Sequence, residues 1–116
     1  MSNVSLMQQL QGFLQITNQR QQLIASNMAN VDTPGYHTQD IDFQSAIQKA
    51  LSQESDAPVQ ATPIEVQGLN ERPDGNNVNI DRESMMLSET QLQYQIGVQL
   101  VKHQFHQILS AISGGS

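Results

Sequence analysis

The chain has 116 residues, which is enough for one ordinary domain. Its net charge of -6, with only five Lys and Arg residues, excludes the basic stripe that a nucleic-acid-binding protein needs. The absence of cysteine excludes disulfides, a thiol nucleophile and Cys-ligated zinc.

Charged residues make up only 14% of the chain, against about 25% in typical soluble domains, and glutamine is the commonest residue instead. Because protein interfaces are depleted in charge, helices rich in neutral amides are expected to meet other protein. No run reaches the roughly 18 apolar residues of a membrane span, and no basic and apolar regions of a cleaved signal peptide are visible at the N-terminus.

The first expected element is a helix over about residues 5–30. Its apolar residues follow the four-three spacing of a coiled-coil seam. Polar residues occupy core-like positions at residues 17–22, so we expect this helix to order fully only against partners. The predicted assembly residues on it are Leu6, Leu10, Phe13 and Ile24.

A tight turn is expected directly after this helix. Pro34 fixes φ and lacks an N–H, and Gly35 after it supplies the positive φ that a type II turn requires. Asn27, Asn30 and Thr33 can hydrogen-bond nearby backbone groups, as such residues do at caps and turns. Local physics alone favours an ordinary helix end with ordinary turn chemistry here.

A short second helix is predicted next, capped by Thr38 or Asp40, with Lys49 in its last turns. Proline and glycine interrupt every helical pattern between about residues 53 and 79. That region is therefore predicted to be loop-rich, with at most a short edge strand over residues 61–67 and a turn or mobile loop over residues 70–77.

The strongest helical signal covers residues 81–112, capped by Asn79 or Asp81. Its apolar residues step by four and three without a break, which indicates a heptad seam. Gly97 within the helix indicates close approach of another helix. The predicted assembly residues are Leu87, Tyr94, Val98, Val101, Phe105, Ile108 and Ile112.

We therefore predict an all-α fold in which long N- and C-terminal helices form a coiled-coil hairpin, with a short middle helix and an extended loop-rich linker. The predicted divisions are an N-terminal helix and turn (1–36), a short helix with a flexible loop region (37–79), and a C-terminal coiled-coil helix (80–116). Each terminal helix has more apolar width than the other can cover. The excess predicts further helices from other copies or other proteins, packed as a helical tube.

No pattern of residues indicates an enzyme, a cofactor or a metal site. His103 and His106 lie three apart, but no acidic residue or third His lies within a turn of them. Asp40 and Asp42 are explained better by helix capping than by catalysis, and His37 is a single group without a fixed partner. The sequence also lacks a glycine-rich phosphate loop and a nucleophile elbow.

The stretch over residues 27–36 resembles the N-x-A-N-x-x-T-P-G-[YF] signature of the flagellar rod and hook protein family. The resemblance extends to the C-terminal helix, and the short length without a central domain resembles the proximal rod proteins of that family. The alternatives are the proximal rod protein FlgC, of similar size, and a non-polymerising helical adaptor or chaperone, which would need a charged outer helix face. The signature residues are Asn27, Ala29, Asn30, Thr33, Pro34, Gly35 and Tyr36.

This resemblance implies a structural subunit of the proximal rod of the bacterial flagellar basal body, the drive shaft that transmits motor torque across the periplasm. It implies self-assembly and contacts with FlgC and further rod subunits, with the rod–ring adaptor FliE and the MS ring. It also implies export by the flagellar type III apparatus without a cleaved signal peptide. Phe43 and Ile47 fit the Phe-x-x-x-apolar export-gate signal of such substrates and are favoured over Phe105 and Leu109, which fit as well.

Overall fold

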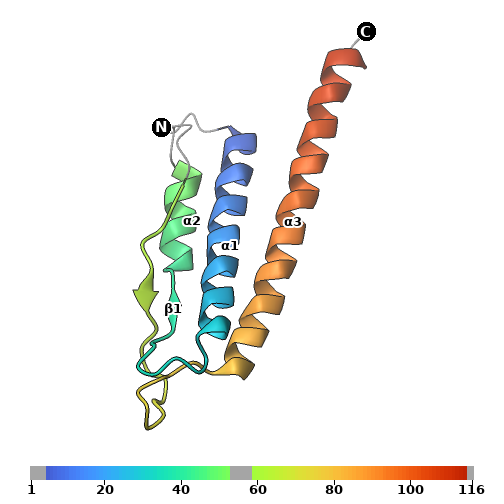
Figure 1. Cartoon of the computed structure of the whole chain (residues 1–116). Coiled ribbons are helices and arrows are strands. Elements are labelled where there is room, and N and C mark those ends of the chain that lie inside the picture. Colours follow the sequence, from blue (N-terminus) through green and yellow to red (C-terminus); the bar gives the residue numbers. More distant parts are fainter. Residues whose placement is uncertain (1–4, 53–58, 115–116) are drawn as a thin grey trace.

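The computed structural model describes residues 5–52 and 59–114. In chain order its elements are α1 (Leu6–Ala29), β1 (Gln39–Asp40), α2 (Phe43–Ser52), β2 (Ile64–Glu65) and α3 (Ile80–Ser113). Helix α1 lies between α2 and α3, and α1 and α3 run antiparallel (Figure 1). The molecule is elongated, with extents of 68 × 27 × 18 Å. The predicted all-α hairpin is therefore confirmed.

Both long helices begin at side-chain caps that match the sequence patterns. At α1, the Ser5 hydroxyl accepts from the Gln8 N–H and the Gln8 side chain accepts from the Ser5 N–H, both at 3.1 Å. This reciprocal capping box satisfies two backbone donors. At α3, the Asn79 side chain accepts from the Arg82 N–H at 3.1 Å. The predicted helix limits are confirmed to within about a residue.

Helix α3 is longer than α1 and extends past the beginning of α1 (Figure 1). Every described residue from Phe105 to the end of α3 is exposed. We call residues 105–113 the overhang. This segment has no cover from the rest of the described chain.

The predicted cap of the second helix is wrong. Helix α2 begins at Phe43, and Asp42 caps it by accepting a hydrogen bond from the Ser45 N–H at 3.2 Å. Thr38 and Asp40 lie too early, because the chain first forms strand β1. The Thr38 side chain bonds to Asn77 instead, and the Asp40 carboxylate pairs with Arg20. The capping role expected for Asp42 of the acidic pair is confirmed, and the one expected for Asp40 is wrong.

A two-residue antiparallel pairing joins β1 to β2. Gln39 pairs with Glu65 and Asp40 with Ile64. Strand β2 lies inside the predicted edge strand over residues 61–67, which confirms that short β segment. Strand β1 was not predicted, because two residues are too few to show the alternation of a strand.

The core is small and sits between α1 and α2. Glycines permit the close helix contacts: a Cβ added at Gly12 would lie 2.9 Å from the Ala50 Cβ, and one at Gly97 would lie 2.7 Å from the Leu14 Cδ2. The close helix approach predicted at Gly97 is confirmed. The cluster of buried apolar residues comprises Ile16, Ile41, Ala46 and Ala50.

Candidate assembly site

The signature stretch forms a helix end followed by the predicted type II turn. Gly35 has a φ of 77°, and the Tyr36 N–H donates to the Thr33 carbonyl at 3.2 Å, which closes the turn over Pro34 and Gly35. The Thr33 hydroxyl donates to the Asn30 side chain at 3.0 Å. The turn residues therefore fix one another locally, as the sequence pattern predicts.

Asn27 is the centre of this stretch and is fully buried. Its Nδ2 donates to the Gln39 carbonyl at 2.8 Å and to the Glu83 Oε1 at 2.7 Å. Its Oδ1 accepts from the Tyr36 hydroxyl at 2.9 Å and from the Gln39 N–H at 3.0 Å. An Asn side chain has two donors and two acceptor positions, and all of them are used. Asn27 thus joins α1, the exit of the turn and α3 in one contact.

A network of charged side chains continues from this contact. Glu83 is fully buried, and its Oε2 accepts from the Arg82 Nη1 at 2.6 Å. Arg82 lies 3.7 Å from the Asp40 carboxylate, which also accepts two hydrogen bonds from Arg20 at 3.0 Å. The Arg20 guanidinium lies 4.9 Å from the centre of the Phe43 ring, within cation–π range. Asp40 therefore serves as an ion-pair partner instead of the predicted helix cap.

The loop before α3 folds over the turn. Asn76 is fully buried, and its Nδ2 donates to the carbonyls of Asn30 and Thr33, both at 2.8 Å. Its Oδ1 accepts from the Val78 N–H at 2.8 Å and from Arg72 at 2.7 Å. Of the two alternatives predicted for residues 70–77, the turn is confirmed, since the Gly75 N–H donates to the Arg72 carbonyl at 2.8 Å, and the mobile loop is wrong, because buried amides hold this segment against the signature turn.

His37 also has partners that the sequence did not indicate. Its Nε2 lies 2.8 Å from the Glu71 Oε1, and its Nδ1 lies 3.4 Å from the Glu65 Oε2. The hydrogen bond to Glu65, followed by the contacts with Glu71, raises the pKa of His37 above its ordinary value of about 6.5. The expectation of an unpartnered histidine is wrong. The contacts were not predictable, because both carboxylates come from distant parts of the linker.

The predicted assembly residues fall into three groups by burial. On α1, Leu10 and Ile24 are buried, Phe13 is half-buried and Leu6 is exposed. On α3, Leu87, Tyr94, Val98 and Val101 are half-buried, while the overhang residues Phe105, Ile108 and Ile112 are 54%, 40% and 75% exposed.

The fully buried side of α3 differs from the apolar seam that the sequence indicates. It consists of Glu83, Thr90 and Gly97, each one heptad after the last. Sequence reasoning missed Glu83 and Thr90 as packing residues, because a charged and a hydroxyl side chain give no apolar signal. Their seven-residue spacing with Gly97 is the pattern that could have indicated them.

The candidate export-gate residues lie in α2. Phe43 and Ile47 are half-buried and pack on the core. The Phe43 ring meets the Phe13 ring edge-on, with centroids 6.4 Å apart. In the folded chain this pair is thus engaged in packing.

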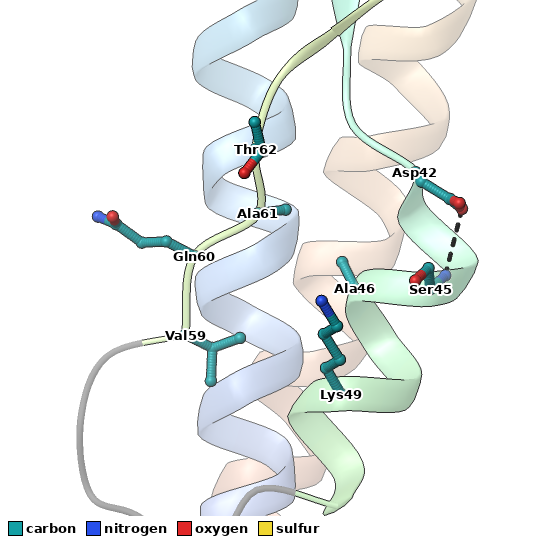
Figure 2. A pocket seen from close by; sticks show the side chains of 8 residues that line it. All are labelled: Asp42, Ser45, Ala46, Lys49, Val59, Gln60, Ala61 and Thr62. Atoms are coloured by element: carbon teal, nitrogen blue, oxygen red, sulfur yellow. Dashed lines mark hydrogen bonds between the residues drawn. The ribbon is translucent and has the colours of Figure 1, made fainter.

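An open pocket of about 240 Å³ lies between α2 and the segment over residues 59–62, and Asp42, Ser45 and Lys49 are among its lining residues (Figure 2). The Asp42 carboxylate there is already engaged as the cap of α2.

Within residues 5–52 and 59–114, no three His, Asp or Glu side chains come together as metal ligands would. No helix of the described chain is long and apolar enough to cross a membrane.

Comparisons with known proteins agree with these features. A family described as "Flagella basal body rod protein" matches residues 7–37, from α1 through the signature turn. The flagellar basal body rod protein FlgB of Escherichia coli (strain K12) is 34% identical over 123 residues, which cover 89% of each chain. FlgB of Salmonella typhimurium is 32% identical with the same coverage, and FlgB of Bacillus subtilis is 26% identical over 93% of each chain.

These relatives cover almost the whole chain, and the family match includes the turn that the buried amides hold in place. The antiparallel terminal helices and the signature turn are the features of a structural helical subunit. The chain belongs to the FlgB family of flagellar basal body rod proteins. Between the two proximal rod proteins left open by the sequence, the relatives favour FlgB over FlgC.

Proposed function

We propose that this chain is a non-catalytic subunit of the proximal rod and assembles through α1 and α3 into the drive shaft that transmits motor torque. One observation carries the proposal. A rod-family signature turn is held firmly at one end of the hairpin, while the apolar overhang at the other end has no cover from the described chain. A subunit of a packed helical tube needs both features: a fixed exit for the chain and a surface for its neighbours.

We assign the roles in assembly to the three predicted segments of the chain. Residues 1–36 and 80–116 build the tube through the assembly residues named above, α2 packs against α1, and the linker over residues 59–79 lies outside the tube. Asn27, Asn30 and Thr33 fix the point at which the chain leaves the tube, and their hydrogen bonds support this role. The turn is thus a joint between the tube and the linker.

The proposed neighbours are further copies of the chain, FlgC and other rod proteins, the adaptor FliE and the MS ring, in the periplasmic part of the basal body.

We further propose that the chain passes unfolded through the flagellar type III export apparatus. Phe43 and Ile47 pack on the core in the folded chain, so a signal made of them would be readable only before folding. Replacing Phe43 by Ala should reduce secretion, whereas Phe105→Ala should leave secretion intact and impair assembly.

A non-polymerising adaptor is less well supported. Such a protein needs a charged outer helix face, whereas Lys102 is the sole Lys, Arg, Asp or Glu between residues 90 and 113. The apolar residues Leu92, Ile96 and Leu100 are about half exposed instead. These surfaces favour packing into a larger assembly.

The proposed function is tested in a flagellated strain that lacks its own proximal rod subunit of this family. Expression of the chain should restore swimming, and purified basal bodies should contain both the rod and this chain. A strain that swims only with its original subunit, or basal bodies whose rods lack the chain, would contradict the proposal. Binding of the chain to a single soluble partner without polymerisation would support the adaptor instead.

A further inference from the structure

An apolar groove lined by residues of α1, α2 and α3 lies beside the base of the overhang. It has a volume of about 200 Å³, and a hydrogen bond from the Gln9 side chain to the Leu51 carbonyl at 3.2 Å joins two of the helices that line it. We call it the tip groove. Its main lining residues are Leu6 and Phe13 of α1, Ile47 and Leu51 of α2, and Ile96 and Leu100 of α3.

The tip groove and the overhang share an unusual lack of charge. Every acidic residue of the chain lies between Asp32 and Glu89, and residues 5–19 contain no charged residue. Lys102 is the sole Lys or Arg after Arg82. Lys49 of α2 is exposed and does not line the groove, so the two surfaces can pack largely without removing charges from water, whereas the other end of α3 carries Asp81, Arg82 and Glu83 and offers no matching surface.

The overhang also continues an interface that already exists within the chain. Gly97 is buried where α3 packs against Phe13 and Leu14 of α1, and the same helix runs on after α1 has ended. Phe105, Ile108 and Ile112 extend the heptad seam into the overhang, where they are exposed. Because α3 is one uninterrupted helix, the overhang cannot fold back into the groove of its own chain. Its cover must come from another molecule.

We propose that the overhang of one copy of the chain docks in the tip groove of a second copy. This inference rests on the proposed function and names the partner and the contact. The overhang and the tip groove are different surfaces of the same chain, so a contact in which only one overhang of a pair is docked is heterologous and can repeat from copy to copy. Phe105, Ile108 and Ile112 supply the apolar side chains that enter the groove beside Leu6 and Leu51.

Paired cysteine variants test this contact directly, because the chain contains no cysteine of its own. Two differently tagged copies are expressed together in the deletion strain, one carrying Ile108→Cys and the other Leu51→Cys, and oxidised within basal bodies. A disulfide requires Cα atoms within about 7 Å, so we expect about tenfold more mixed dimer than when Gln48→Cys replaces Leu51→Cys. Gln48 is the matched control, since it is exposed on α2 and does not line the groove.

Each outcome decides the inference. Mixed dimers confined to the Leu51→Cys pair support it, and so does the same result with Leu109→Cys and Leu6→Cys if the first pair prevents assembly. Dimers of Ile108→Cys with itself, equal cross-linking at Gln48→Cys, or cross-linking of the overhang to FlgC alone would overturn it. A strain that swims with neither cysteine pair cross-linked overturns the contact and leaves the rod function intact. If the unmodified chain does not restore swimming, the proposed function fails, and the same cross-links in concentrated purified protein then decide the contact.

Discussion

The two ends of the α1–α3 hairpin differ in the side chains that they bury and expose. The joint end comprises the signature turn, the loop before α3 and the start of α3, and the tip end comprises the tip groove and the overhang. At the joint end, buried polar side chains such as Asn27, Glu83 and Asn76 have hydrogen-bond partners within the same chain. At the tip end, apolar side chains such as Leu6 and Ile112 are exposed at 51% and 75%. Within α1 and α3, the charged residues lie toward the joint end, and Lys102 is the sole Lys, Arg, Asp or Glu in the tip halves of these two helices.

This difference assigns two tasks to two kinds of contact: polar contacts fix the geometry of the chain, and apolar contacts drive its association with neighbours. A fully satisfied polar network specifies one arrangement of the chain but contributes little net energy, because its groups also bond well to water. Apolar surface is not directional, but its burial contributes about 25 cal/mol per Å². The chain thus uses polar contacts to fix the angle at which it leaves the helices and keeps its apolar surface for neighbours.

The largest expected effect comes from placing a charge at the tip. Ile108→Asp should abolish swimming, because an unpaired carboxylate would be buried in the assembly. Since Ile108 is exposed in the single chain, the free energy of unfolding of the monomer should change by less than about 0.5 kcal/mol. Motility plates and urea unfolding of the purified chain measure the two effects.

Val101→Asp and Ile108→Val serve as comparisons for this prediction. Val101 is half-buried in the single chain, so its replacement by Asp should reduce both stability and swimming. Ile108→Val should retain both. Normal swimming with both Asp variants would count heavily against a packed tube.

The next effect comes from breaking the joint. Asn27→Leu leaves the Glu83 carboxylate and the Gln39 backbone groups without their buried partner, so we expect a loss of about 3 kcal/mol in the free energy of unfolding. Asn18→Leu is the matched control on the exposed side of α1. Far-UV circular dichroism during urea unfolding measures both. Similar stabilities of the two variants would show that the buried network is dispensable.

A smaller effect is expected at the turn. Gly35→Val should cost about 1–2 kcal/mol, because a β-branched residue is strained at positive φ. A Cβ at this position would meet nothing within 4 Å, so the cost is purely conformational. Gly35→Asn should therefore retain most of the stability and rod assembly. Equal losses for Val and Asn would point to a lost contact in place of backbone strain.

The smallest effect concerns pH and the linker. His37 has a raised pKa in the folded chain, so its stabilising contribution is present below about pH 6.5 and is lost as the pH rises through the folded-state pKa. His37→Gln should remove this part of the pH dependence and leave the joint unaffected. Thermal unfolding of both proteins across this pH window checks the prediction. Parallel pH profiles would contradict the role of the Glu65 and Glu71 contacts.

The helices and the turn were predictable from local sequence signals. Ser5 and Asn79 have cap chemistry, Pro34 and Gly35 determine the turn, and Gly97 indicated a close helix contact that the structure contains. These features depend on neighbouring residues or on a regular period. The family signature supplied the class of protein from the same short stretch.

The joint itself was not predictable, because its contacts connect residues far apart in the sequence. Asn27 and Glu83 are 56 positions apart, and Asn76 reaches Asn30 across 46 positions. A polar loop such as residues 70–77 looks mobile until its amides are seen to satisfy buried carbonyls. The packing of Thr90 was hidden for a related reason, since hydrophobic periodicity does not register hydroxyl groups.

The central claim is that the joint is complete in the single chain, whereas the tip is completed only by assembly. Amide hydrogen exchange of the purified monomer and of the chain in isolated rods tests it most directly. We predict protection around Asn27 and Glu83 in both samples, and protection of residues 105–113 only in rods. Equal protection of the overhang in monomer and rod, or loss of protection at the joint in the monomer, would contradict the account.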